Sequence, residues 1–323
     1  MKMLFQIIVV IASGLLILWW MIARPIISNE SAPQAENRIN PETLRTHVEV
    51  LSNRFVPRDD DHPENLHKVA QYIATELRST SARVSDQEFT VDSTAYKNVI
   101  AEYGPESPDI IVVGAHYDTA GDQPGADDNA SGVAGLLELG RLLSRVTLRS
   151  KLVLVAYALE EPPHFRTENM GSAVHAKSLR ERGVSVKLMI SLEMIGYFSD
   201  NENSQSFPIG LLRLFYPSRG NFILVVDKVF SNHARQVKKW MSAASDLPVY
   251  SINAPSIIPG VDFSDHLSFW NQGYPAVMVT DTAFYRNNAY HSRMDTADRL
   301  DYGKMAKVVN GIFTYVIEND KKS

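Results

Sequence analysis

Apolar and polar positions follow two periods along most of the chain, which has 323 residues. Apolar residues at every third or fourth position predict a helix, whereas short apolar runs rich in β-branched residues predict buried strands. The expected helices are 41–55, 62–79, 131–143, 171–183, 229–244 and 302–317. The expected strands are 84–90, 96–102, 110–115, 151–158, 186–195, 222–227 and 274–280.

Strands and helices thus alternate over most of the chain. This order predicts one α/β domain with a mixed, mostly parallel central sheet flanked by helices. Two stretches, 197–220 and 247–261, fit neither period and contain several Pro, Ser and Asn residues. We expect both to be irregular segments, and we expect them to build the walls of a pocket.

The amino-terminal stretch has a different pattern. Residues 3–22 are apolar except for Gln6, Ser13 and Gly14, and a membrane-spanning helix needs about 20 such residues. The run is longer than the ~7–15 apolar residues of a signal peptide, and no small-x-small cleavage site follows it. We therefore expect residues 1–24 to be a membrane anchor rather than a cleaved signal, followed by a linker (25–40) and the folded domain (41–323).

Composition excludes several classes of function. The net charge is −5 and no basic cluster is present, so we do not expect nucleic acid as a partner. The chain has no cysteine, which excludes disulfides, thiolate zinc sites and a cysteine nucleophile. Any metal ion must therefore be held by His, Asp and Glu.

A candidate site begins where the apolar run 110–115 ends. His116 and Asp118 follow it directly, and residues two apart in extended backbone lean to the same side. Asp118 could accept a hydrogen bond from one ring nitrogen of His116 and leave the other free for a metal. The acidic, glycine-flanked turn at Asp127 and Asp128 places a further carboxylate nearby.

Acids or histidine also follow the other buried strands. Glu160 and Glu161 end one strand, Glu193 lies in another, and His291 follows the last. A buried carboxylate is costly unless it is paired or bound to metal. Oxygen and nitrogen ligands without sulfur suit zinc, and this set is larger than one zinc requires. Two metal ions about 3.5–4 Å apart would use all of the ligands, and a free carboxylate would serve as general base.

Six short motifs now occur in order, and together they resemble the dizinc exopeptidases of metallopeptidase family twenty-eight. This family includes secreted aminopeptidases, glutamate carboxypeptidase and glutaminyl cyclases, and the resemblance covers about residue 96 to the end. The motifs are His116-Tyr-Asp118, Gly125-Ala-Asp-Asp128-Asn-Ala-Ser-Gly132, Glu160-Glu161, Leu192-Glu193-Met-Ile-Gly196, Ser264-Asp265-His266 and Tyr290-His291-x-x-x-Asp295-Thr296.

The resemblance implies a ligand set for two zinc ions. Asp128 would bridge them, His116 and Glu193 would complete one site, and Glu161 and His291 would complete the other. Many members of the family carry Asp where this chain has Glu193. The longer arm of Glu could bind its zinc through both oxygens or shift the ion.

The resemblance also implies roles for residues around the metals. Glu160 would be the general base, Asp118 would orient His116, and Tyr290 would stabilise the oxyanion. Asp265 and His266 would form an inner polar wall that contacts substrate, and the two residues by themselves fit a structural role equally well. Asp295 and Thr296 would fix the loop that carries His291.

The implied activity is hydrolysis of peptides from one end, most simply the amino end, by a domain held outside the cytoplasm by the amino-terminal anchor. Three alternatives stay open. A carboxypeptidase would need a basic pocket, for which Arg166, Arg213, Arg219 and Arg286 lie in suitable loops. A glutaminyl cyclase manages with one zinc. A non-catalytic, membrane-anchored scaffold protein with the same fold would not need the general base Glu160. Side-chain preference and oligomeric state are not readable from the sequence.

Overall fold

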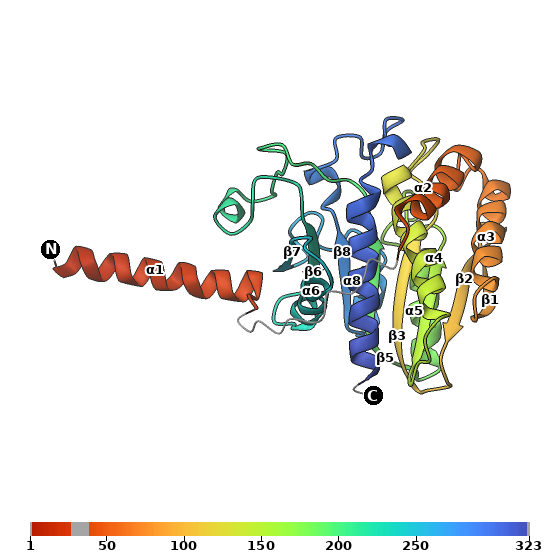
Figure 1. Cartoon of the computed structure of the whole chain (residues 1–323), viewed down its shortest axis with the longest axis horizontal. Coiled ribbons are helices and arrows are strands. Elements are labelled where there is room, and N and C mark those ends of the chain that lie inside the picture. The colour runs from red at the N-terminus through yellow and green to blue at the C-terminus, as the bar shows by residue number, and fades with distance from the viewer. Residues whose placement is uncertain (1, 27–38, 322–323) are drawn as a thin grey trace.

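The computed structural model describes residues 2–26 and 39–321 (Figure 1). Eight strands form one sheet in the order β1-β2-β4-β3-β5-β8-β6-β7. The central strands β4, β3, β5 and β8 are parallel. At one edge β1 pairs antiparallel with β2, and β2 pairs antiparallel with β4. On the other side β6 pairs antiparallel with β8 and parallel with the edge strand β7. The strands are β1 (Arg83–Val91), β2 (Thr94–Tyr103), β3 (Asp109–His116), β4 (Lys151–Tyr157), β5 (Ser185–Glu193), β6 (Ile223–Asp227), β7 (Val249–Asn253) and β8 (Ala276–Thr280).

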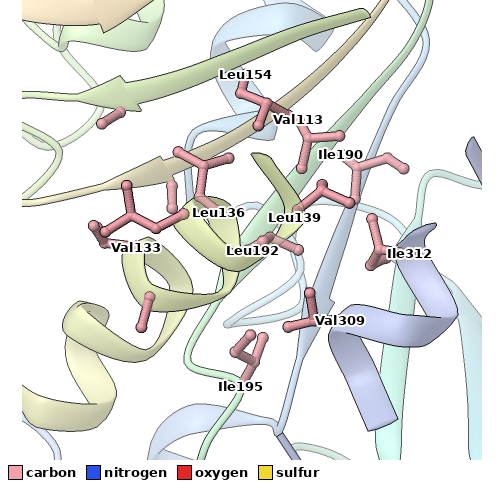
Figure 2. Packing of buried hydrophobic residues seen from close by; sticks show 14 of the residues in the cluster. Val113, Val133, Leu136, Leu139, Leu154, Ile190, Leu192, Ile195, Val309 and Ile312 are labelled. Carbon is pink, nitrogen blue, oxygen red and sulfur yellow. The ribbon is translucent and has the colours of Figure 1, made fainter. Parts of the chain in front are cut away.

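Helices cover both faces of the sheet, so the expected α/β architecture is confirmed. Neighbouring strand residues point to opposite faces: Val113 packs with α4 and α8, whereas Val112 packs with α5 and α7. Figure 2 shows the first of these layers, in which Leu136 of α4 and Val309 of α8 meet the strand residues. The helices are α1 (Lys2–Ala23), α2 (Pro41–Glu49), α3 (Pro63–Arg78), α4 (Gly132–Leu143), α5 (Gly171–Glu181), α6 (His233–Ala244), α7 (His266–Asn271) and α8 (Tyr302–Asp320).

Three elements differ from those expected. The segment 247–261 contains the edge strand β7, which pairs with β6, so our expectation that it is wholly irregular was wrong. Helix α6 begins at His233 rather than at 229, because Asp227 accepts the backbone N–H groups of Lys228 and Ala234 and holds the chain in a turn before the helix. The short helix α7 was not expected from the apolar pattern.

Helix α1 stands outside the domain except at its last turn. It is long and apolar enough to cross a membrane, a property that signal sequences share. Ala23 is buried against β6, β7 and β8 in a cluster that includes Val226, Ile252 and Met278. Most of the expected linker, 27–38, lies outside the described residues.

Candidate active site

The candidate residues lie at the carboxyl edge of the parallel strands. His116 ends β3, Glu193 ends β5, and Glu160 and Glu161 follow β4. Carboxyl ends of parallel strands meet at one edge of a sheet, which is where open α/β sheets bind ligands. Two loops complete the group: Asp128 lies between β3 and α4, and His291 lies between β8 and α8.

The carboxylate of Asp128 lies between two histidines. Its Oδ1 is 3.5 Å from His116 Nε2, and its Oδ2 is 3.1 Å from His291 Nε2. Glu193 Oε2 lies 3.4 Å from His116 Nε2, and Glu161 Oε1 lies 3.2 Å from His291 Nε2. The structure therefore brings all five expected ligands together, with one pair on each side of Asp128.

The chemistry of this group fits a bound cation. Asp128 Oδ2 and Glu161 Oε1 are buried, and although both lie near His291 Nε2, neither makes a well-aligned hydrogen bond. Such atoms are costly to bury unless a charge compensates them. Burial raises the pKa of Glu161 to about 8, and the nearby Asp128 carboxylate adds to this. Ligand atoms of His116, Asp128 and Glu161 lie within 4.8 Å of one another. Imidazole and carboxylate donors without sulfur suit zinc.

Asp118 fixes the backbone of Glu160 and Glu161 by hydrogen bonds. Its Oδ1 accepts the N–H of Glu160 at 3.1 Å, and its Oδ2 accepts the N–H of Glu161 at 3.0 Å. The expected contact with His116 is longer, with 3.4 Å between Oδ1 and Nδ1. Asp118 thus joins the end of β3 to the end of β4, a role that the motif spacing does not reveal.

The loop that carries Asp128 is held by a second acid. Asp295 accepts the backbone N–H groups of Asp127 and Asp128 at 3.0–3.1 Å. The side chain of Asp127 accepts hydrogen bonds from the backbone N–H of Gly196 and from Asn287. Asp295 therefore ties the Asp128 loop to the segment that bears His291.

A buried arginine supports the same loops and was not predicted from the sequence. Arg58 is 1% exposed, and its guanidinium donates to the backbone carbonyls of Leu51, Tyr117, Pro124 and Gly125. It brings a positive charge close to the acidic centre and links residues 51–58 to the loop before Asp128. An isolated arginine in a polar stretch gives no sequence signal for such a role.

Tyr290 lies against the cluster of expected metal ligands. Its ring stacks on that of His291 with 3.8 Å between centroids. Burial raises the pKa of its phenol above the usual value, so the hydroxyl keeps its proton and can act as a hydrogen-bond donor.

Asp265 and His266 are fully buried at the start of α7. His266 Nε2 contacts the carbonyl of Val261 at 2.9 Å, and neither residue lines the hollows around the site. Ser264, from the same motif, donates to Glu193 Oε2 at 2.7 Å. This motif therefore holds the carboxylate of Glu193, an expected metal ligand, and substrate contact by Asp265 and His266 stays a prediction.

Two connected hollows surround the site. A cleft is lined by the acidic residues Asp128, Glu160, Glu161 and Glu193 together with Tyr290 and His291. An apolar pocket of about 80 Å³ shares Glu193 and Tyr290 with this cleft. Its other walls come from the sheet and from both segments that were expected to build a pocket, and they include Phe207, Leu212, Phe222, Val226, Ile258 and Met278.

The four arginines considered for a carboxylate pocket do not line either hollow. Arg166 pairs with Asp262, and Arg219 pairs with Glu202. Arg286 is buried and binds Gln205 and two backbone carbonyls. Arg213 is exposed on a short 3₁₀ turn, Gly210–Leu214.

Comparison with known proteins agrees with this geometry. The sequence profile of the family described as Peptidase family M28 matches residues 98–316. An uncharacterized protein of Escherichia coli, YfbL, is 50% identical over 291 residues, which cover 87% of this chain and 89% of that protein. A probable leucine aminopeptidase 1 of Trichophyton verrucosum is 29% identical over 237 residues, which cover 68% of this chain but only 58% of that protein.

Solved structures share the fold. BSAP, a zinc aminopeptidase from Bacillus subtilis, superposes with a TM-score of 0.68 at 14% identity, covering 88% of this chain and 96% of that chain. A glutaminyl cyclase from Bacteroides thetaiotaomicron superposes with a TM-score of 0.65 at 18% identity, covering 86% and 97%.

Proposed function

Since this chain belongs to peptidase family M28 and is a metallopeptidase hydrolase, we propose that it is a two-zinc aminopeptidase that removes apolar residues from the amino ends of peptides. The position of Asp128 carries this proposal. One carboxylate oxygen faces His116 and the other faces His291. A carboxylate placed in this way can bridge two ions, as co-catalytic metal sites require.

The ligands would divide into two sets. His116 and Glu193 would bind one zinc, Glu161 and His291 the other, and Asp128 both. When bound, such a pair of ions lowers the pKa of a shared water and polarises the substrate carbonyl.

Glu160 and Tyr290 would act on the substrate in different roles. Both line the acidic cleft, and the backbone of Glu160 is fixed by Asp118. The Glu160 carboxylate would take a proton from the attacking water and deliver it to the nitrogen of the leaving amine. The Tyr290 hydroxyl would donate a hydrogen bond to the oxygen on which negative charge develops.

The lining of the cleft favours the amino end of a peptide. Three of its four carboxylates would bind zinc, so the ions would offset their charge, and neither Lys nor Arg is among its lining residues in the described structure. The cleft therefore offers no cationic side chain that could pair with the terminal carboxylate of a carboxypeptidase substrate. The adjoining apolar pocket would take the first side chain, in keeping with the leucine aminopeptidase name of one relative.

A peptide digest tests this proposal. The full chain, purified in detergent with zinc, is incubated with matched free and amino-acetylated peptides, and the products are identified by mass spectrometry. We expect stepwise loss from free amino ends only, and no products from the Glu160→Gln variant. Loss from carboxyl ends would show a carboxypeptidase, loss of ammonia from amino-terminal Gln would show a cyclase, and absence of any reaction and of bound zinc would show a scaffold.

We propose further that α1 holds the enzyme in a membrane with the catalytic domain outside the cytoplasm. The support is the length and apolar character of α1. Reporters fused after Ser323 test the orientation. A reporter active only in the cytoplasm would contradict it.

A further inference from the structure

We infer that the catalytic domain rests directly on the bilayer, with a patch of exposed apolar side chains beside α1 in the interfacial layer. This inference rests on the proposal that α1 spans the membrane. The membrane-facing patch consists of Ile209, Leu211 and Leu214 in one segment, and of Val229 and Phe230 in another. Leu214 is 68% exposed and Phe230 is 78% exposed, and exposed apolar side chains that gather on one surface mark sites of contact with a partner or a membrane.

The last turn of α1 is fixed to the domain by hydrogen bonds. Lys238 Nζ donates to the carbonyl of Ala23 at 2.7 Å and to that of Arg24 at 2.8 Å. The hydroxyl of Ser251, on β7, also donates to the carbonyl of Ala23, at 2.9 Å. The end of α1 is therefore attached to the domain surface itself.

The length of α1 leaves no gap between bilayer and domain. The helix has 22 residues, so it is about 33 Å long at 1.5 Å per residue. The hydrocarbon core of a bilayer is about 30 Å thick. Almost the whole helix is needed to cross that core, including the part next to the bound carbonyl of Ala23. The surface around Ala23 must then lie at the level of the lipid headgroups.

Both parts of the patch lie beside this point. Leu212 and Tyr216, from the first segment, belong to the same apolar cluster as Ala23. Figure 1 shows the coiled segment near residue 210, in green, projecting from the domain on the side from which α1 leaves. In the second segment, the carbonyls of Lys228 and Ser231 accept hydrogen bonds from Asn253, two residues beyond Ser251 on β7.

The polar residues of the patch suit a lipid surface. Arg213 and Lys228 are exposed and alternate with its apolar side chains. Apolar side chains flanked by basic ones are typical of surfaces that enter the headgroup layer of anionic membranes. We therefore assign the patch to phospholipid rather than to a second copy of the chain or to another protein.

The chain contains no cysteine, so single labels can test the position of the patch. A cysteine replaces Leu214, Ile209 or, as control, Ser85, which is exposed on β1 at the opposite edge of the sheet. An environment-sensitive fluorophore is attached to the single cysteine of each variant. The full chain is then reconstituted into vesicles of phosphatidylcholine and phosphatidylglycerol that carry a quencher near the headgroups. Circular dichroism and the thermal unfolding temperature confirm that each labelled protein is folded, so the result does not depend on the proposed activity.

We expect lipid-borne quenching at Leu214 and Ile209 to be several times that at Ser85. Adding Leu214→Glu to the Ile209→Cys protein should reduce quenching at 209, because a charged side chain is expelled from the interface. Equal quenching at Leu214 and Ser85 in vesicle-bound protein would overturn the inference, as would failure of the protein to bind vesicles. The fluorophore at Leu214 could instead become shielded as protein density rises, with no quenching by lipid. That result would assign the patch to a second copy of the chain and would also overturn the inference.

Discussion

Asp295 Oδ2 accepts the backbone N–H of Asp128 at 3.0 Å, although 167 residues separate the two in sequence. The acid that lies between both histidines is thus held in place from the carboxyl-terminal part of the chain. Asp295 is buried, and burial raises its pKa to about 7, with the neighbouring Asp127 adding to this. Groups that support metal ligands without touching the metal contribute to metal affinity.

Replacement of Asp295 should therefore weaken metal binding. We expect Asp295→Ala to lower zinc affinity roughly 10–100-fold, because the Asp128 loop loses the acceptor for two backbone N–H groups. Competition against a zinc chelator measures the change. The matched control is Asp298→Ala, an exposed acid three residues later, which should leave zinc affinity unchanged. Equal affinities for the two variants would contradict the supporting role.

The number of bound ions can be read by elemental analysis. We expect two zinc ions per chain, loss of activity after dialysis against a chelator, and recovery on adding zinc. His291→Ala should retain about one ion, because Glu161 and Asp128 alone are a poor tetrahedral ligand set. Retention of two ions by this variant would show that His291 is not a ligand.

The apolar pocket should set side-chain preference. Val226 is buried in its wall on β6, so Val226→Phe would reduce the space for a large first residue. We expect kcat/KM for an amino-terminal Leu substrate to fall by at least roughly tenfold, the scale on which apolar pockets discriminate. The value for an amino-terminal Ala substrate, measured on the same protein, should change little. A similar loss on both substrates would indicate general damage to the fold.

His175 should make the fold sensitive to acid. It is buried on α5 beside the hydroxyl of Tyr157, and burial lowers its pKa to about 3, with Arg182 adding to this. The unfolded chain binds a proton at an ordinary pKa of about 6.5. Between pH 6.5 and 3 the unfolded state therefore holds more protons at this site, and stability falls as the pH falls.

Thermal unfolding over this pH range measures the effect of His175. Each pH unit inside the window should cost up to about 1.4 kcal/mol through this group. In His175→Gln that contribution is absent, so Tm should fall less steeply between pH 6.5 and 3 than in the wild-type chain. Parallel curves would show that His175 does not cause the acid sensitivity.

Local sequence pattern is enough to predict the alternation of strands and helices and the candidate ligands. Both follow from local features: the period of apolar residues reports which backbone geometry buries them, and acids directly after buried strands need a partner. Because carboxyl ends of parallel strands meet at one edge, the positions of His116, Glu161 and Glu193 in the sequence suffice to group them. The apolar pattern does not predict the edge strand β7, because this strand is short, lies between prolines and gains its stability from pairing with β6.

The way in which the site is held could not be predicted, because it depends on contacts between distant segments. The contacts of Asp118 with the backbone of Glu160, of Asp295 with Asp128, and of Arg58 with four carbonyls join segments far apart in the chain. Such contacts depend on how strands are ordered in the sheet, and residue spacing within one segment carries no information about them. The attachment of Ala23 to Ser251 is of the same kind. Local pattern predicts an apolar helix there, but the hydrogen bond across 228 residues places it against the domain.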